Sequence, residues 1–297
     1  MKQTDILLES GTNELEIVMF HIGKSTFGIN VLKVREIIQT VDVTETPNQH
    51  EHYEGIIHLR EEVFPVIDLA GVLGYPPSEN PEKDTFIIAE LNKMKVAFRV
   101  QEVTRIHRIS WENIEKLGGL ADWNNTHTIG VVKMKQEMAL LLDYEKIVMD
   151  ICPGSGFPGY SPEKRKEKDR SNKHILAAED SSILQKMLKD TLEEAGYTIT
   201  LFPNGKEAWE YINSLLEEKN SNYPDLIITD IEMPQMDGHH LTKKIKEHAM
   251  LRDIPVVIFS SLITDSLYHK GENVGADAQI SKPEINKLID KIDQLIL

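Results

Sequence analysis

The chain has 297 residues, 40% of them hydrophobic and 27% charged, and a net charge of -15 at pH 7. This charge opposes binding to the phosphates of nucleic acid. The single cysteine, Cys152, excludes an internal disulfide and any site built from cysteines alone. No apolar run approaches the ~20 residues that cross a bilayer, and the amino terminus lacks the pattern of a secretion signal. We therefore expect an acidic, cytoplasmic protein with no nucleic-acid partner and no direct membrane insertion, long enough for two domains.

The first half of the chain, from Leu15 to Asp150, has the pattern of short β-strands separated by turns. The apolar residues of 31–38 fall at positions 31, 34, 37 and 38, a spacing that predicts a short helix. A helical turn is expected at 69–73. The predicted strands are 16–22, 25–30, 55–60, 62–69, 85–90, 95–100, 129–133 and 138–142. Closely spaced short strands favour a β-sandwich or small β-barrels.

No catalytic pattern is present in this half. Its histidines are scattered, and the one close pair, His50 and His52, is a weak metal signal because histidines alternating along a strand or loop are more often solvated than ligating. A β-barrel without chemistry of its own is most simply a protein-binding module.

Three runs in this half resemble parts of the CheW-type coupling domain of chemotaxis. The run 27–38 is similar to the opening of that domain, and the runs 55–60 and 64–69 are similar to its central signature. The resemblance covers about residues 10–150 and implies two packed small β-barrels. It also implies that these bind chemoreceptor signalling tips and a CheA-type histidine kinase, with Arg60 near the contacts. One departure is Glu61-Glu62, where the family commonly has a glycine turn.

Residues 152–173 differ in composition from the segments on either side. Proline and glycine are frequent up to Pro162, and a charged run follows. This segment is net basic, whereas the segments before and after it are net acidic. A solvated interdomain linker is the simplest interpretation. We therefore predict one domain at 1–151, a linker at 152–173 and a second domain at 174–297.

From His174 onward, predicted strands alternate with predicted helices. Ser181 is an expected N-cap for the first of these helices and Gly196 its stop. Repeated βα units predict a doubly wound sheet of five parallel strands. The strands are expected at 174–178, 197–201, 225–229, 254–259 and 276–280, and the helices at 181–195, 205–216, 238–250 and 285–296.

Polar residues follow the strands that should meet at one edge of this sheet: Glu179 and Asp180, Asp230, Ser260, and Lys282. Three crowded carboxylates repel one another unless a cation joins them. Mg²⁺ prefers oxygen ligands and binds through one or two carboxylates and a phosphoryl oxygen. Asp180 and Asp230 are the expected direct ligands, with Glu179 acting through a water. Asp230 would accept a phosphoryl group, and Lys282 and Ser260 would bind its oxygens.

This set resembles the receiver domain of two-component response regulators, a CheY-like fold, over residues 174–297. The resemblance implies that Asp230 is the phosphoacceptor, that the backbone carbonyl of Glu232 is a third Mg²⁺ ligand, and that Ser260 and Lys282 respond to the phosphoryl group. One departure is Gln279, which stands where the family usually has an aromatic switch residue.

A coupling domain followed by a receiver predicts a chemotaxis adaptor associated with membrane receptor arrays, not an enzyme. Phosphorylation of Asp230 would modulate the coupling of chemoreceptors to the kinase. The alternative is a constitutive coupling scaffold whose receiver is a phosphate sink. A transcription factor would need a DNA-binding domain and a different charge. An aspartate-nucleophile phosphatase usually has Asp where Glu232 stands, and its other motifs are missing.

Overall fold

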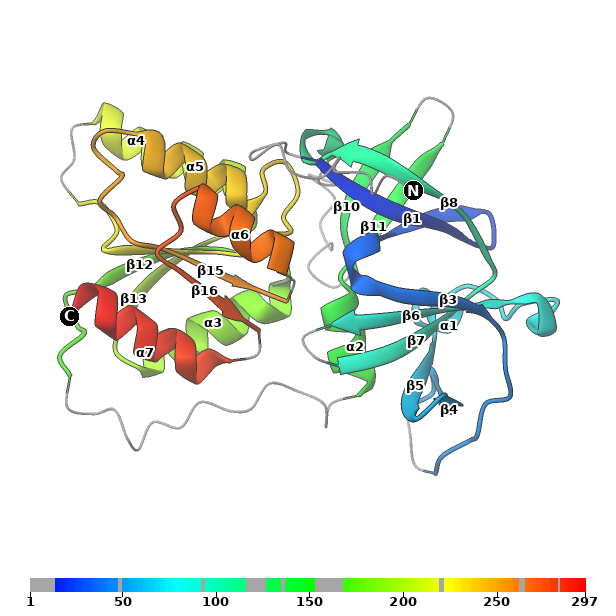
Figure 1. Ribbon diagram of the computed structural model, residues 1–297. Helices are drawn as coiled ribbons and strands as arrows, with labels where there is room; N and C mark the ends of the chain where they lie inside the picture. The colour runs from blue at the N-terminus through cyan, green and yellow to red at the C-terminus, as the bar shows by residue number, and fades with distance from the viewer. Residues whose placement is uncertain are drawn as a thin grey trace. The chain divides into compact units, whose positions relative to one another are not determined.

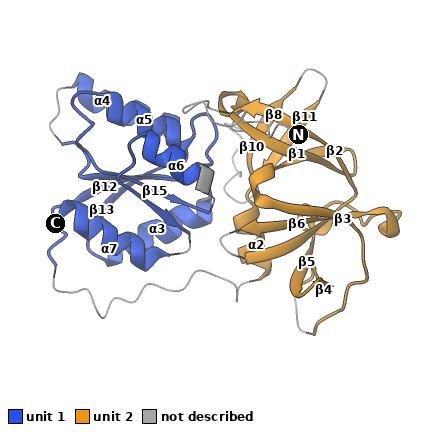
Figure 2. Ribbon diagram, viewed as in Figure 1, with its two compact units in different colours: residues 1–13, 157–297 blue, residues 14–156 orange. Residues whose placement is uncertain are grey.

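The computed structural model describes residues 14–47, 50–91, 94–115, 127–134, 137–152, 168–218, 222–261, 265–282 and 284–297. These residues form two compact units, 14–152 and 168–297, which we call the first and second domains (Figure 2). Most of the predicted linker, 153–167, lies outside the described residues. Among the helices that are described, none is long and apolar enough to cross a membrane.

The first domain consists of two β-sheets with short helices at their ends (Figure 1). The six-stranded sheet has the order β8-β1-β2-β11-β10-β9, and the five-stranded sheet the order β3-β6-β7-β5-β4. The strands are β1 (Glu14–Ile22), β2 (Ser25–Asn30), β3 (Val34–Gln39), β4 (Tyr53–Leu59), β5 (Glu62–Asp68), β6 (Thr85–Leu91), β7 (Met94–Val100), β8 (Glu102–Ser110), β9 (Ile114–Glu115), β10 (Thr128–Lys133) and β11 (Met138–Leu142). The helices are α1 (Leu69–Val72) and α2 (Tyr144–Ile151), and the 3₁₀ turns are η1 (Val31–Lys33), η2 (Pro81–Lys83) and η3 (Trp111–Asn113). The predicted fold of two small barrel-like β-sheets is confirmed.

The largest core cluster joins residues from both sheets and from α2. Phe20 of β1 and Phe27 of β2 stack in it with ring centroids 5.7 Å apart, and both rings are fully buried. The first and last parts of the domain also meet directly. Strand β11 pairs in parallel with β2, and the buried Tyr144 hydroxyl donates a hydrogen bond of 2.8 Å to the carbonyl of Gly28, 116 residues earlier.

The helix predicted at 31–38 is wrong. Only the 3₁₀ turn η1 is helical there, and the Asn30 side chain accepts a hydrogen bond from Leu32 N at its start. Strand β3 follows at once and pairs with β6. β-Branched residues favour strands when a partner strand is available, and exposure alternates along β3 as it does in a strand. Strands β8 and β9 and helix α2 were not predicted.

The second domain is a parallel sheet with the strand order β13-β12-β14-β15-β16. Helices α3 and α7 pack on one face and α4 and α5 on the other, each face having its own apolar core (Figure 1). The strands are β12 (His174–Ala178), β13 (Thr198–Phe202), β14 (Leu226–Thr229), β15 (Val256–Ser260) and β16 (Ala278–Ser281). The helices are α3 (Ser182–Glu194), α4 (Gly205–Glu217), α5 (Gly238–Glu247), α6 (Asp265–Asn273) and α7 (Ile285–Ile296). The predicted doubly wound five-stranded sheet is confirmed, with α6 as an unpredicted helix.

Candidate functional site

The functional side chains predicted in the second domain follow the carboxyl ends of four neighbouring strands. Glu179 and Asp180 follow β12, Asp230 follows β14, Ser260 ends β15 and Lys282 follows β16. Carboxylate oxygens of Glu179, Asp180 and Asp230 all lie within 4.8 Å of one another. Because parallel strands all end at the same edge, the sheet brings together residues that are more than 100 positions apart in the chain, such as Glu179 and Lys282.

Lys282 joins two of these carboxylates. Its Nζ lies 2.7 Å from Glu179 Oε2 and 2.8 Å from Asp230 Oδ2. All three side chains are buried, so both contacts are shielded from water and stronger than a surface ion pair. Lys282 is therefore placed to meet any group that becomes attached to Asp230.

The protein backbone fixes the orientation of Asp230. The Ile231 N–H donates a hydrogen bond of 2.6 Å to Asp230 Oδ1, and the Asp230 N–H donates to the Ala178 carbonyl of β12. Gly238, the first residue of α5, packs directly against the backbone of Asp230. A Cβ added to Gly238 would stand 1.8 Å from the Asp230 carbonyl oxygen. Only glycine fits this close approach.

Burial and charge change the proton affinities of this cluster. Burial, together with the nearby Asp230 carboxylate, raises the pKa of Glu179 to about 8 although Lys282 opposes the change. Burial alone would lower the pKa of Lys282, but the carboxylates of Asp230 and Glu179 outweigh it and raise that pKa. The cluster thus holds a permanent cation and an excess of acidic groups.

The remaining residues predicted for this site are also buried at its edge. Ser260 is fully buried, and its carbonyl accepts a hydrogen bond of 3.0 Å from the Lys282 N–H, which ties the ends of β15 and β16 together. Glu232, whose backbone carbonyl was expected to bind a metal, is buried two residues after Asp230. Three converging carboxylates fit a hard divalent cation such as Mg²⁺, which prefers oxygen ligands.

The Gln279 side chain forms a hydrogen bond with α6, a helix that the sequence did not predict. Its Nε2 donates a hydrogen bond of 2.6 Å to the Tyr268 carbonyl of α6. A Cβ on Gly271, one turn further along α6, would stand 2.3 Å from Gln279 Oε1. The side chain in the switch position therefore packs against the backbone of α6 in a space that Gly271 leaves open.

Arg60 of the first domain is placed in the two-residue turn between β4 and β5. It has a φ of 58°, a left-handed conformation that glycine adopts more easily. Its side chain is 79% exposed and pairs with Glu36 at 3.1 Å. A groove of about 620 Å³ beside it is lined by Arg35, Glu36, Leu59, Arg60, Glu61, Glu62, Phe64 and Ile88.

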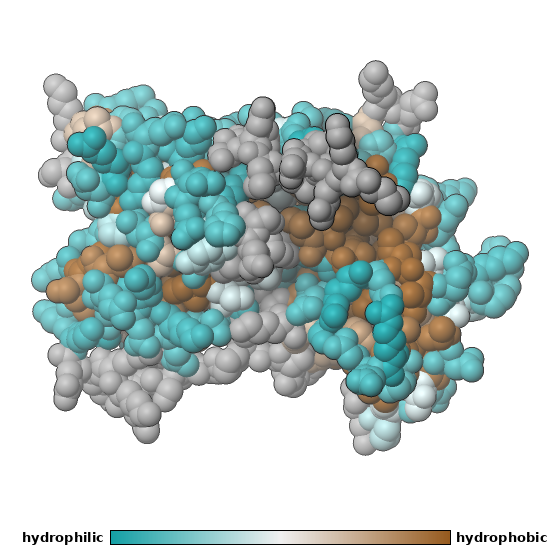
Figure 3. All heavy atoms as spheres, in the orientation of Figure 1, coloured by the Kyte–Doolittle hydropathy of each residue, from teal (hydrophilic) through white to brown (hydrophobic). Residues whose placement is uncertain are grey.

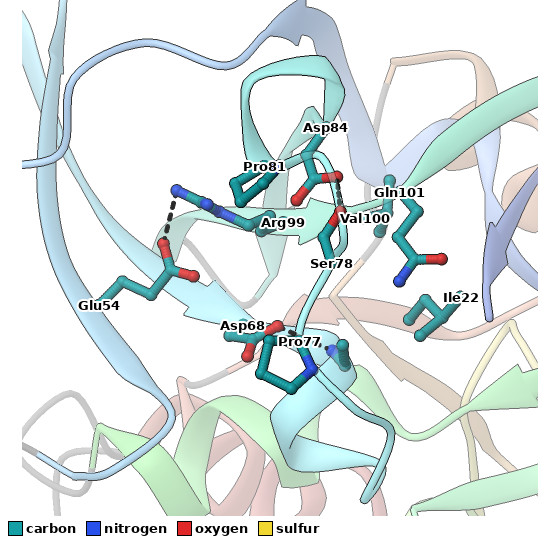
Figure 4. A pocket seen from close by; sticks show the side chains of 11 residues that line it. Ile22, Glu54, Asp68, Pro77, Ser78, Pro81, Asp84, Arg99, Val100 and Gln101 are labelled. Carbon is teal, nitrogen blue, oxygen red and sulfur yellow. Dashed lines mark hydrogen bonds and ion pairs between the residues drawn. The ribbon is translucent and has the colours of Figure 1, made fainter.

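A smaller cavity of about 80 Å³ in the same domain surrounds Arg99 (Figure 4). The guanidinium of Arg99 pairs with Glu54 at 2.8 Å and lies over the Phe86 ring at 5.3 Å. Asp84 accepts a hydrogen bond of 2.7 Å from the Ser78 hydroxyl, and burial raises the pKa of both carboxyls, Asp84 and Glu54. The contacts of Arg99 and Asp84 are thus with other residues of the same domain, and we interpret these side chains as structural.

Comparison with known proteins matches each half of the chain to a different family model. Residues 16–152 match the model of the CheW-like domain, and residues 175–293 match that of the response regulator receiver domain. The chain is 30% identical over 149 residues to chemotaxis protein CheW of Thermotoga maritima, covering 50% of this chain and 97% of that protein. It is 33% identical over 123 residues to the two-component response regulator ORR5 of Oryza sativa, covering 40% of this chain and 87% of that protein.

One similarity extends over both domains. The chain is 29% identical over 299 residues to chemotaxis protein CheV3 of Helicobacter pylori, covering 96% of this chain and 95% of that protein. The chain thus combines a CheW-like domain with a response regulator receiver domain that follows it. The relatives that match over both domains, chemotaxis proteins CheV3, CheV1 and CheV2 of Helicobacter pylori, are 29%, 28% and 26% identical to this chain.

Proposed function

We propose that the protein is a phosphorylation-regulated chemotaxis adaptor. Its CheW-like domain would couple chemoreceptor signalling tips to a CheA-type histidine kinase within membrane receptor arrays. Its receiver would accept a phosphoryl group on Asp230 and thereby modulate the coupling. The observation that carries this proposal is the buried contact of Lys282 with Asp230 inside a cluster of three carboxylates.

In the proposed transfer, a carboxylate oxygen of Asp230 attacks the phosphorus of a phosphohistidine or a small acyl phosphate. The new bond joins that oxygen to phosphorus, and the bond from phosphorus to the leaving nitrogen or oxygen breaks. The leaving group retains the electron pair and takes a proton from water where it needs one. Backbone and Lys282 contacts already orient Asp230, and such positioning supplies most of the catalysis in phosphoryl transfer.

Asp180, Asp230 and the backbone carbonyl of Glu232 would hold a Mg²⁺ ion, and Glu179 would bind it through a water. When bound, the ion would supply positive charge that offsets the repulsion between the carboxylates and the incoming phosphoryl oxygens. Lys282 would then exchange its contact with Asp230 for the phosphoryl oxygens, and the Ser260 hydroxyl would donate to another of them.

The proposed coupling surface is the Arg60 groove of the CheW-like domain. Its lining includes the apolar side chains of Leu59, Phe64 and Ile88. Figure 3 shows apolar residues gathered on one face of this domain. Apolar surface beside an exposed arginine is typical of protein-binding sites.

Mass spectrometry tests the receiver chemistry most directly. The full chain is incubated with Mg²⁺ and a small acyl phosphate, beside an Asp230→Asn variant. We expect a gain of one phosphoryl group that requires Mg²⁺ and is absent from the variant. No gain in a folded, Mg²⁺-binding protein would reject the phosphoacceptor role.

The competing candidate, a constitutive scaffold whose receiver is a phosphate sink, differs in its effect on the kinase. In reconstituted arrays of receptor, kinase and this protein, regulation predicts that phosphorylated wild type and the Asp230→Asn variant support different kinase activities. Equal kinase activity, with phosphodonor consumed through wild type and not through the variant, would favour the sink.

A further inference from the structure

A buried ion pair attaches the segment that enters the receiver to the last helix of the domain. Arg170 Nε and Nη2 donate hydrogen bonds of 2.8 Å each to the two carboxylate oxygens of Asp293 in α7. The side chains are only 3% and 4% exposed. A two-point contact between planar groups fixes orientation as well as distance.

Further partners complete this contact. The Tyr197 hydroxyl also donates to Asp293, Arg170 Nη1 donates to the Ala195 carbonyl at 3.2 Å, and Lys168 pairs with Asp293 at 3.2 Å. We call Arg170, Asp293 and Tyr197 the α7 clamp. Because water is excluded, the electrostatic attraction between Arg170 and Asp293 is stronger than in an exposed pair.

The opposite end of α7 begins beside the phosphoacceptor. Lys282, which contacts Asp230 and Glu179, precedes Ile285, the first residue of the helix, by three positions. The helix has 12 residues and is therefore about 18 Å long. Four of its apolar residues are buried in the core: Ile285, Leu288, Ile289 and Ile292. An uninterrupted helix packed in this way moves as one piece.

We propose that α7 links the state of Asp230 to the segment that joins the two domains, with Lys282 at one end and the α7 clamp at the other. This inference rests on the proposed function, and it specifies how phosphorylation of Asp230 would reach the segment before the receiver. A phosphoryl group on Asp230 gives Lys282 new oxygen partners and so changes what holds the start of α7. The clamp carries the resulting shift of the helix to Arg170, four residues before the first strand of the receiver.

The amide of Lys173 is a direct reporter, since it donates a hydrogen bond of 3.0 Å to the Arg170 carbonyl. Its hydrogen exchange would be measured in the full chain with and without Mg²⁺ and acyl phosphate, with phosphoryl gain followed by mass in the same samples. The test variant is Arg170→Met with Asp293→Leu, which removes both buried charges of the pair and leaves only the half-exposed Lys168 to be solvated by water. Tyr197→Phe, which removes one hydrogen bond, is the milder second variant. Lys287→Met removes an exposed ion pair on the same helix and is the control.

In wild type and in the control we expect phosphorylation to change the Lys173 exchange rate about threefold or more. In the double variant the phosphoryl gain should be equal and the exchange rate should no longer respond, with Tyr197→Phe intermediate. An equal response in the double variant, or none in phosphorylated wild type, would overturn the inference.

A second comparison needs no phosphodonor and so separates this inference from the proposed function. Asp230→Asn weakens one of the two contacts that hold Lys282. It should change the Lys173 exchange rate when the clamp is intact and leave it unchanged in the double variant. If wild type gains no phosphoryl group, the phosphoacceptor role fails. The comparison of Asp230→Asn with and without the clamp then tests the role of α7. If Asp230→Asn changes the Lys173 exchange rate equally with and without the clamp, the proposed role of α7 is rejected.

Discussion

Lys282 Nζ lies 2.8 Å from Asp230 Oδ2, with both side chains buried. The same Nζ lies 2.7 Å from Glu179 Oε2. One lysine thus neutralises part of a cluster that would otherwise hold three carboxylates without a cation. The proposed phosphoacceptor is therefore held by the same lysine that would bind the phosphoryl group.

Lys282→Met should lower the free energy of unfolding of the receiver by about 3–5 kcal/mol, because it leaves Glu179 and Asp230 buried without their cation. Mg²⁺ should restore more stability to this variant than to wild type. Urea denaturation with and without Mg²⁺ measures both effects. The control, Lys287→Met, removes an exposed pair with Glu284 and should cost at most about 1 kcal/mol. Equal losses in the two variants would contradict the role of the buried contact.

Gly238→Ala should destabilise the receiver and reduce phosphoryl gain together, because the added Cβ would meet the Asp230 carbonyl at 1.8 Å. A contact this short with backbone forces α5 or Asp230 to move, and we expect a loss of more than about 2 kcal/mol. Gly74→Ala is the comparison. Gly74 has a φ of +73° and open space around it, so that change costs only about 1–2 kcal/mol of backbone strain. Thermal unfolding and phosphoryl mass gain are the measurements.

Gly271→Ala and Gln279→Ala should not be additive. The first change alone inserts a Cβ 2.3 Å from Gln279 Oε1 and displaces the side chain that bonds to the Tyr268 carbonyl. In a background where Gln279 is already alanine, the three atoms nearest to that Cβ are gone, and its destabilising effect should shrink or reverse. A double-mutant cycle of unfolding free energies should give a coupling of about 0.5–3 kcal/mol. Simple additivity would show that Gln279 does not hold α6.

Stability of the receiver should depend on pH through Asp293. Burial opposes ionisation of this carboxyl, but hydrogen bonds from Arg170, Tyr197 and Lys168 outweigh it and lower its pKa to about 2, from an ordinary value of 3.8. A depressed pKa stabilises the folded state above the unfolded-state pKa and loses that contribution as pH falls toward the folded-state value. The free energy of unfolding should therefore fall between about pH 4 and pH 2. The fall should be shallower in Arg170→Met with Asp293→Leu, as measured by denaturant titration at each pH.

Arg60→Gly should leave the CheW-like domain at least as stable as wild type and weaken binding to its partners. Glycine relieves the left-handed conformation at φ 58°, while the exposed pair with Glu36 contributes little. Binding to a chemoreceptor tip or a kinase regulatory domain should weaken about fivefold or more if Arg60 is a contact residue. Arg108→Ala, which removes an exposed arginine from β8, is the control. Unchanged binding in Arg60→Gly would remove Arg60 from the coupling surface.

The receiver site could be predicted closely because its geometry follows from sheet topology. Once the apolar runs before Glu179, Asp230 and Lys282 are recognised as parallel strands, their ends must meet at one edge. The structure brings all of these side chains together. What could not be predicted was their pairing in the absence of a phosphoryl group, since contact between Lys282 and Glu179 depends on rotamers and burial that no spacing encodes.

Other features depend on partners distant in sequence. Residues 31–38 have a helical spacing of apolar side chains, yet pairing with β6 makes 34–39 a strand. Arg170 belongs to a charged run that favoured a solvated linker, but it is buried in an ion pair with Asp293, which lies 123 residues later. Local sequence contains neither partner, so local pattern alone favoured the wrong structure at 31–38 and missed the buried contact of Arg170.

The pairing of β2 with β11 has a consequence for how the protein is made on the ribosome. Gly28 and Tyr144 are 116 residues apart and share a hydrogen bond, so the edge of β2 that pairs with β11 stays open until the end of the domain has been synthesised. In the receiver the paired strands lie closer together in the chain, and the most distant pairing is that of β12 with β14, whose register joins Ile175 to Leu226. Contacts between distant positions slow folding, and unpaired strand edges invite association while they wait. The amino-terminal half, though synthesised first, is therefore the half that would benefit more from chaperones during translation.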